Sequence, residues 1–323
     1  MAFAIFDLVT LYSGAILIIM KNISILGIFV ADLVFFGETI PITGETILGE
    51  KYDIGPGGKG SNQAVAAAKA GAKTFFISKI GDDQFGTMAK KIYDEVGVDY
   101  SKVIISKEHS TGAAGILVNN KGQNAINVVP GAAGALTADD IDAASNVIIE
   151  SSIFLTQLEA PKDVVYYALK IANENNVTTI LNPAPASQID ENIFPFIDYF
   201  TPNEIEASFY VNHKIENEED AKKASEKLLQ LGIKNVIITL GEKGAYFANN
   251  EESFHVNALN LEGKVVDTTG AGDAFNGGLA VALTEEKNIK DSIKFANIIA
   301  GLSTTKICTA KSIPLRSEID NLL

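Results

Sequence analysis

Residues 267–278 read DTTGAGDAFNGG. A Gly-Ala-Gly turn at 270–272 leads into a segment rich in Ala and Leu, which predicts a helix over 271–283. The first N–H groups of a helix lack partners within it and carry partial positive charge, so such a turn can bind an anion. Asp273, beside these donors, could deprotonate a hydroxyl that faces an incoming phosphoryl group. A helix cap would explain one acidic residue, but not both Asp267 and Asp273.

A second glycine-rich stretch, GPGGKGSNQ at residues 55–63, precedes another predicted helix. It matches the G-x-G-x-x-G spacing of dinucleotide-binding loops, but such a loop directly follows the first strand, and this one does not. It is not a Walker A loop either, because Gly60 follows Lys59 where that loop has Ser or Thr. A loop of this kind can hold a polyhydroxylated ligand, with donors from Lys59 and Asn62. A tight turn with a helix cap is the alternative.

Polar residues also stand at the ends of predicted strands. TPNEIE at 201–206 places Asn and Glu three residues apart on one helix face, where both could face Mg²⁺ and phosphate oxygens. A capped helix start explains the same pair. TLGEKG at 239–244 ends a strand with a glycine turn, which suits either a nucleotide site or a hairpin. Asp32 and Glu159 end two further strands and are candidates for binding hydroxyl groups.

Short apolar segments alternate with helical ones along the chain. Strands are predicted over 23–34, 73–80, 153–158, 177–181 and 235–240, and helices over 61–72, 84–96, 162–175, 216–231, 271–283 and 290–304. This alternation predicts an α/β three-layer sandwich with a central, mostly parallel sheet. Segments at about 34–55 and 113–129, the second with a hairpin turn at Asn120-Lys121-Gly122, are predicted to form a small β lid outside that sheet.

Composition excludes several classes of function. The 323 residues carry a formal net charge of −14, which repels the phosphates of nucleic acids, so we expect no nucleic-acid partner. Three His and one Cys are too few for a common zinc site or an internal disulfide. The single Cys308 is consistent with a reducing cytoplasm, where we expect the protein to reside. A divalent metal would bind to oxygen ligands, as Mg²⁺ does with phosphates.

Residues 1–20 form an apolar stretch interrupted by Asp7. No Lys or Arg precedes the apolar run, so it lacks the basic region of a signal peptide. An acidic residue inside a membrane span is costly, so membrane association is not expected. We interpret the stretch as an extension that is not native, with a membrane anchor or an ordered extra element as the alternatives. The folded domain would then cover residues 21–323.

Together these motifs resemble the PfkB (ribokinase-like) family of carbohydrate kinases, from about Met20 to Leu323. GPGGKGSNQA and DTTGAGDAFNGG are similar to the two signatures of that family, in its order and spacing. TGAAGILV, LNPAPA, TPNEIEA and SIPLRSEID resemble the branch that acts on ribose. The resemblance implies ATP-dependent phosphorylation of the 5-hydroxyl of D-ribose, with Mg²⁺ and K⁺ as cofactors. It also implies a homodimer that forms through the lid.

The resemblance also implies roles for individual residues. Asp273 would be the catalytic base, and the anion hole would comprise Gly270, Ala271 and Gly272. The sugar would contact Asp32, Gly58, Lys59, Gly60, Ser61, Asn62 and Glu159. ATP would be surrounded by Asn203, Thr239, Leu240, Gly241, Glu242, Lys243, Gly244, Gly272 and Asn297, and Glu206 would hold Mg²⁺ through water. The oxygens around K⁺ would come from Asp267, Thr269, Ser303, Lys306, Cys308 and Ser312.

Two residues depart from the family pattern. Val30 stands where an Asn is common, and valine cannot donate to a sugar hydroxyl. Cys308 stands where Gly is usual, which restricts the backbone of the expected K⁺ loop. Another acceptor, such as deoxyribose, fructose or a nucleoside, therefore remains an alternative to ribose. An alternative of a different class is a catalytically inactive, sugar-binding regulator.

Overall fold

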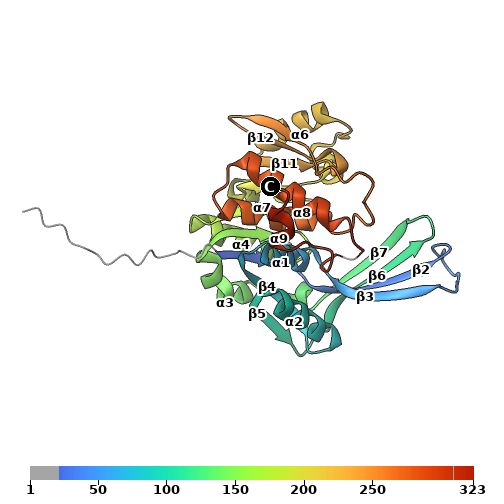
Figure 1. The fold of residues 1–323 in the computed structure, drawn as a ribbon. Coiled ribbons are helices and arrows are strands. Elements are labelled where there is room, and N and C mark those ends of the chain that lie inside the picture. The colour runs from blue at the N-terminus through green and yellow to red at the C-terminus, as the bar shows by residue number, and fades with distance from the viewer. Residues whose placement is uncertain (1–21, 308) are drawn as a thin grey trace, which may run out of the picture.

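The computed structural model describes residues 22–307 and 309–323, and in these ranges the strands form a nine-strand sheet and a separate four-strand sheet (Figure 1). The α/β prediction with a mostly parallel central sheet is confirmed. The expectations for residues 1–20 and for Cys308 lie outside the described residues.

The large sheet has the order β13-β12-β11-β10-β9-β8-β1-β4-β5. Its strands are β1 (Asn22–Leu26), β4 (Lys73–Gly81), β5 (Asp99–Ser106), β8 (Ser151–Thr156), β9 (Thr178–Leu181), β10 (Tyr199–Phe200), β11 (Asn235–Thr239), β12 (Ala245–Asn249) and β13 (Ser253–Val256). The strands from β5 to β11 pair in parallel, and β12 and β13 continue the sheet antiparallel. The carboxyl ends of the parallel strands therefore share one edge.

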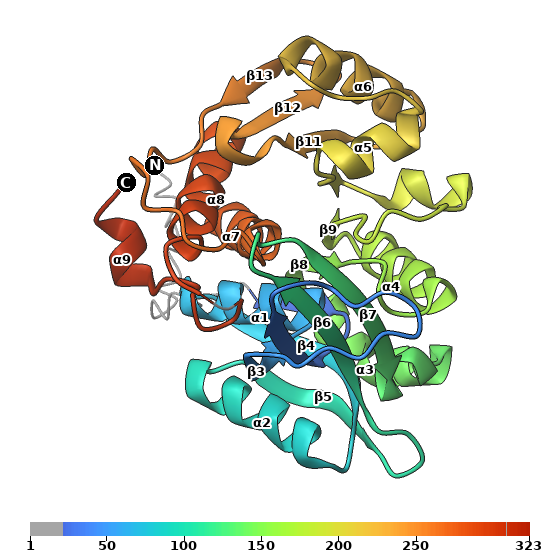
Figure 2. The same ribbon diagram turned by 90° about the vertical axis from the view of Figure 1, so that its right-hand side faces the viewer.

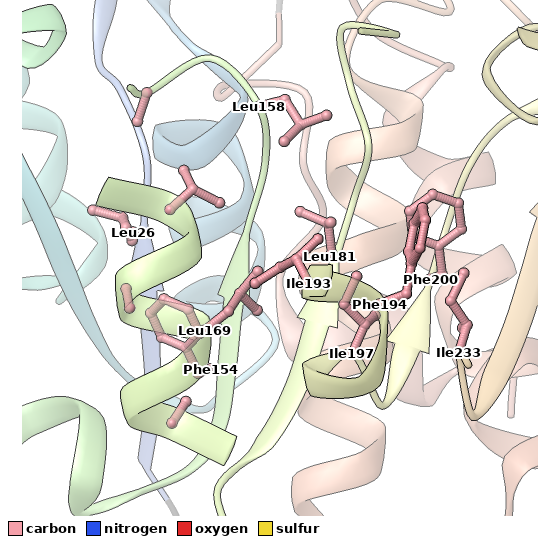
Figure 3. Close-up of a cluster of buried hydrophobic side chains, with 14 of the residues drawn as sticks. Leu26, Phe154, Leu158, Leu169, Leu181, Ile193, Phe194, Ile197, Phe200 and Ile233 are labelled. Carbon is pink, nitrogen blue, oxygen red and sulfur yellow. The ribbon is translucent and has the colours of Figure 1, made fainter. Parts of the chain in front are cut away.

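Helices cover both faces of this sheet. They are α1 (Lys59–Lys69), α2 (Gln84–Val96), α3 (Ala138–Ile149), α4 (Lys162–Glu174), α5 (Glu204–Val211), α6 (Glu218–Gln230), α7 (Ala271–Thr284), α8 (Ile289–Ser303) and α9 (Arg316–Asp320). Successive strand residues point to opposite faces. Phe154 of β8 packs with Leu169 of α4 on one face (Figure 3), while its neighbour Leu155 belongs to the core beneath α1 and α7 on the other. Because both faces of the large sheet are buried, its inner strands are apolar along almost their whole length.

The small sheet, called the lid below, has the order β3-β2-β6-β7. Its strands are β2 (Val30–Gly37), β3 (Lys51–Gly57), β6 (Thr111–Asn119) and β7 (Asn124–Gly131). Figure 1 shows it reaching out from the body, and Figure 2 shows it turned toward the viewer. The predicted hairpin of β6 and β7 is confirmed.

The prediction of one strand over 23–34 is wrong. The chain forms β1 in the large sheet and then β2 in the lid, separated by residues 27–29. The break occurs where Gly27 meets the backbone of Gly60, so close that a side chain on either residue would clash with the other. The lid thus begins at Val30, earlier than the predicted boundary at residue 34. An uninterrupted apolar pattern concealed this change of sheet.

The strands that connect the body to the lid cross close to one another, and glycines allow their backbones to touch. A Cβ on Gly58 would lie 2.5 Å from the carbonyl oxygen of Ile28, and one on Gly112 would lie 2.6 Å from that of Pro130. Gly131 (φ 57°) similarly contacts the backbone of Ser110. These contacts fix the direction in which the lid leaves the body.

Local signals account for the helix ends that were predicted well. The helix predicted over 84–96 is confirmed at both ends, because the side chain of Asp83 accepts from the N–H groups of Phe85 and Gly86, and Gly97 closes the helix at φ 78°. The elements α3, β5, β12 and β13 were not predicted.

In the ranges 22–307 and 309–323, none of the helices combines the length and apolar character needed to span a membrane.

Candidate active site

The predicted functional residues meet at the carboxyl edge of the large sheet. Glu159 follows β8, Asn203 follows β10 and Thr239 ends β11. Helices α1 and α7 begin at the same edge, with Lys59 in the first turn of α1 and Asp273 in the first turn of α7. Crevices at this edge are where open α/β sheets bind ligands.

A cavity of about 150 Å³ opens there. Its walls combine segments that are far apart in the sequence, and they comprise Lys59, Asn182, Ala184, Thr201, Asn203, Glu206, Thr239, Gly270, Gly272, Asp273 and Asn276. Seven of these were predicted as site residues, from four separate motifs. The structure therefore brings the motifs together around one space.

The residues predicted to form an anion hole lie at the start of α7. Gly270 precedes the helix with φ 79°, and the N–H of Ala274 donates to its carbonyl oxygen. The N–H of Ala271 donates to the carbonyl oxygen of Thr268 (3.2 Å), so it does not face the cavity as a free donor. Of the three residues of the predicted anion hole, Gly270 and Gly272 line the cavity.

Asp273 is almost fully buried at the wall of the cavity. The side-chain N–H groups of Asn62 (3.0 Å) and Gln63 (3.2 Å) donate to its two carboxylate oxygens. Burial raises the pKa of Asp273, while the charge of Lys59 and the two amide donors act to lower it. The result is a carboxylate held in a fixed orientation, with a pKa above that of an exposed aspartate.

Lys59 is the cation shared by the acidic residues of the site. The nearby negative charge of Asp273 raises the pKa of the Lys59 ammonium, burial acts to lower it, and Glu159, Glu206 and Asp32 raise it further. Lys59 thus remains charged. It can neutralise part of the negative charge that a phosphate group would bring into the cavity.

Asp32 and Glu159 are also influenced by the charges of Lys59 and Asp273. Burial is the main cause that raises the pKa of Asp32 to about 6 and that of Glu159 to about 7. The backbone N–H of Lys59 donates to Glu159 (2.9 Å), which anchors the carboxylate beside the first turn of α1. Ser61, also predicted to contact the sugar, is fully buried and accepts a hydrogen bond from the hydroxyl of Tyr93 instead.

Asn203 and Glu206 form a capping box at the start of α5. Asn203 accepts from the N–H groups of Ile205 and Glu206, and the carboxylate of Glu206 accepts from the N–H of Asn203 (2.9 Å). Both residues also line the cavity. Burial raises the pKa of Glu206. A helix cap and a place beside bound phosphates are therefore compatible at this motif.

The glycine turn after β11 is a hairpin to β12, and it lies beside the candidate nucleotide site. The backbone of Thr239 bridges to Asn203, and Gly244 (φ 101°) packs against the backbone of residues 256–258. Asn297 donates to the carbonyl oxygens of Val256 (3.3 Å) and Asn257 (3.0 Å). Asn297 therefore fixes the segment next to the turn, rather than lining the cavity itself.

The segments predicted to bind K⁺ adjoin one another. The N–H groups of Val266 and Asp267 both donate to the carbonyl oxygen of Thr304. Ser303 and Ser312 are buried, whereas Lys306 forms an exposed ion pair with Glu318. Within the described parts of the chain, no three His, Cys, Asp or Glu residues cluster as a metal site would require.

Four buried polar residues of the site were not singled out from the sequence. Asn182, Thr201 and Asn276 line the cavity, and Gln63 lies behind Asp273. Their positions directly after β9, directly after β10 and one helical turn into α7 are the signal that could have identified the first three. Gln63 carries no such signal, because it does not stand at a strand end and the residues that follow it in α1 are small and apolar.

Comparisons with known proteins identify the family of this chain. A family model described as pfkB family carbohydrate kinase matches residues 20–316. The ribokinase of Haemophilus influenzae is 38% identical over 298 residues, covering 92% of this chain and 97% of that protein. The deoxyribokinase of Salmonella typhimurium is 32% identical over 303 residues, covering 94% of this chain and 98% of that protein. The chain belongs to the pfkB family of carbohydrate kinases.

A solved structure in the same family carries ligands. The ribokinase of Arabidopsis thaliana, complexed with ribose and ATP, superposes with a TM-score of 0.87 at 30% sequence identity, covering 94% of this chain and 98% of that one. The fold described above is thus a ribokinase-like fold.

Proposed function

We propose that this protein is a ribokinase, which transfers the terminal phosphoryl group of ATP to the 5-hydroxyl of D-ribose. The observation that carries the proposal is the buried Asp273 carboxylate at the start of α7, in one cavity with Lys59 and the Gly270–Gly272 turn. The identity to several proteins named ribokinase supports ribose as the acceptor.

Phosphoryl transfer through a loose transition state depends mainly on positioning and charge neutralisation. In this proposal Asp273 orients the acceptor hydroxyl and takes its proton late in the reaction. Its raised pKa makes it a stronger base than an exposed aspartate. The backbone N–H groups of Gly270 and Gly272, which line the cavity, would stabilise charge on the moving phosphoryl group, each contributing about 3–4 kcal/mol. Asp32, Glu159 and Lys59 bind the sugar hydroxyls.

The chain offers suitable groups for both proposed metal ions. Glu206 would hold a hydrated Mg²⁺, which would neutralise charge on the phosphates of ATP. Residues 266–267 and Thr304, which are hydrogen-bonded to each other, lie among the residues that would supply the hydroxyl and carbonyl oxygens proposed for K⁺. A cation there adds positive potential beside the anion turn.

Deoxyribose is the second candidate acceptor. Val30 is a buried apolar side chain at the first residue of β2, two residues before Asp32. A valine at this position removes a donor without removing the carboxylates that bind the other hydroxyls. The identity to a deoxyribokinase points the same way.

The acceptor is tested with a panel of sugars and coupled detection of ADP, in the presence of Mg²⁺ and K⁺. We expect the highest kcat/KM with ribose. A higher value with 2-deoxyribose would favour the second candidate, and a preference for fructose or a nucleoside would contradict both. Binding of sugars without any turnover would instead support a catalytically inactive regulator.

The role of Asp273 is tested with Asp273→Asn. This change keeps the shape of the side chain but removes the base, so we expect turnover to fall by more than about tenfold while ATP still binds. ATP binding measured by calorimetry is the control for an intact site. A variant that retains more than about a tenth of the wild-type turnover would contradict the assignment of the base.

The proposal includes a homodimer that forms through the lid and residence in the cytoplasm. The lid exposes large apolar side chains on both of its faces, among them Phe35 and Tyr52 on one face and Ile126 on the other. Exposed apolar area of this kind favours association with a second copy.

Expression from Met20, followed by cell fractionation, tests whether residues 1–19 alter localisation.

A further inference from the structure

Asp273 belongs to a ring of buried polar groups to which the proposed reaction assigns no role. The ring passes through Gln63, Asn182, Thr201 and Asn276 and returns to Gly272, the residue before Asp273. All of these side chains are nearly or completely buried. Because they come from α1, α7 and the ends of β9 and β10, the ring ties the start of α7 to the edge of the sheet.

Two backbone carbonyl groups fix the direction of every hydrogen bond in the ring. The carbonyl oxygen of Thr201 can only accept, so the side-chain N–H of Asn182 donates to it (3.0 Å), and the oxygen of the Asn182 amide is left to accept from Gln63 (3.2 Å). The Gln63 amide nitrogen must therefore face the ring. Its second N–H donates to Asp273 (3.2 Å).

In the other half of the ring, a backbone carbonyl again fixes the direction of the hydrogen bonds. The carbonyl oxygen of Gly272 accepts from the side chain of Asn276 (2.8 Å), which leaves the Asn276 amide oxygen to accept from the hydroxyl of Thr201 (2.6 Å). The oxygen of Gln63 is also used, because the side chain of Gln157 donates to it. Gln63 thus has every polar atom paired and a single available orientation.

We propose that Gln63 is a positioning residue for phosphoryl transfer, which holds the Asp273 carboxylate toward the acceptor hydroxyl from the side away from the cavity. Gln63 is fully buried and does not line the cavity, so it cannot touch a substrate. As a neutral donor it orients the carboxylate without the charge neutralisation that a cation in its place would cause. The proposal rests on the proposed function, because Gln63 acts only through Asp273.

The test compares three single variants with wild-type enzyme, using the best acceptor from the sugar panel. Gln63→Met keeps the approximate size and removes the donor, and we expect kcat to fall about tenfold while KM for ATP and for the sugar changes by less than about threefold. Gln157→Met removes only the group that orients Gln63, so a smaller loss of kcat in the same direction is expected. Thr284→Val removes a buried hydroxyl elsewhere on α7, bonded to the carbonyl oxygen of Ala280, and should leave kcat unchanged.

A double-mutant cycle separates positioning from packing. In the Asp273→Asn background, Gln63→Met should cause no further loss of turnover, because the group that it positions is already absent. An equal loss in both backgrounds, or a Gln63→Met enzyme with more than a third of the wild-type kcat, would overturn the proposal. If Gln63→Met does not fold, the same cycle is run with Gln157→Met. A wild-type protein that phosphorylates none of the sugars would instead overturn the proposed function.

Discussion

At the site, four carboxylates share the single ammonium group of Lys59. Asp273, Glu159, Glu206 and Asp32 each raise its pKa, and each of the four has a raised pKa of its own because of burial. Such an excess of buried negative charge is costly in an empty site. In the proposed reaction these carboxylates accept hydrogen bonds from the sugar hydroxyls and from the water around Mg²⁺.

These pKa values predict how sugar utilisation depends on pH. Glu159, with a pKa of about 7, and Asp32, with a pKa of about 6, are charged above these values and accept hydrogen bonds from sugar hydroxyls. As the pH falls, each gains a proton and loses its attraction for Lys59. We expect kcat/KM for the sugar to fall as the pH is lowered from 8 through 7 to 5.5. Initial rates at saturating ATP measure this.

Glu159→Gln is the matched variant for this profile. It keeps the shape of the side chain and cannot titrate, so the inflection near pH 7 should disappear while the lower one remains. A wild-type profile that is flat between pH 8 and 5.5 would show that neither carboxylate controls sugar binding.

The sequence allowed some of these residues to be predicted and not others. Asp273 and Lys59 stand in glycine-rich motifs whose local chemistry points outward to a ligand. Gln63 acts through contacts with segments about 120 to 210 residues away, and a buried amide in a helix has no local pattern that reveals such partners. The function of a hydrogen-bonded ring becomes visible only when its members are placed in space.

Among the elements, the packing of α1 on α7 positions both the sugar-binding and the catalytic segments. A Cβ on Gly277 would lie 2.6 Å from the Cβ of Ala66 and 2.7 Å from the carbonyl oxygen of Gln63. Glycine at this position lets α7 approach the backbone of α1. The approach holds Asn62 and Gln63 within hydrogen-bonding distance of Asp273.

Gly277→Ala should therefore destabilise the protein, although alanine favours a helix. The clash with the backbone of α1 costs about 1–3 kcal/mol, which exceeds the gain of about 1 kcal/mol in helix propensity. Urea unfolding measures the difference, and turnover should fall as well. Gly115→Ala in the lid is the control, because nothing lies within 4 Å of a Cβ there. Equal midpoints for Gly277→Ala and wild type would contradict this account of the packing.

The two segments proposed to hold K⁺ predict activation by that ion. Segment 266–267 is bonded to Thr304, and Thr309 packs against Gly270, so a cation bound between them would stabilise the anion turn. We expect kcat to rise when Na⁺ is replaced by K⁺ at constant ionic strength. Equal rates in both salts would argue against a selective site, and Rb⁺, which is close to K⁺ in size, should activate similarly.

At the scale of the whole molecule, the alternation of strands and helices was sufficient to predict the layered body. The lid was predicted as a small sheet, but its first strand was merged with β1. Both strands are apolar, and the change of sheet depends on a contact between Gly27 and Gly60 that lie far apart in the sequence. A pattern of hydrophobicity cannot report which sheet a strand joins.

The exposed apolar faces of the lid predict association with a second copy. Phe35→Asp places a charge on one face and Ile126→Asp on the other, so the variant that yields monomers identifies the face that forms the interface. Sedimentation velocity over a range of concentrations measures the outcome. Two variants that both remain dimeric, or a wild-type protein that is monomeric at all concentrations, would exclude a dimer through the lid.

The crowded crossing beneath the lid limits how this sheet can move. With Gly58, Gly112 and Gly131 each pressed against a neighbouring backbone, the strands at the crossing cannot slide past one another individually. If the lid moves, the segments that join it to the body must rotate together about this crossing. Asp32 lies only two residues beyond Val30, the first residue of the lid, and is therefore close to the crossing. A rotation of the lid about the crossing would displace Asp32 little and the far ends of the lid strands much more.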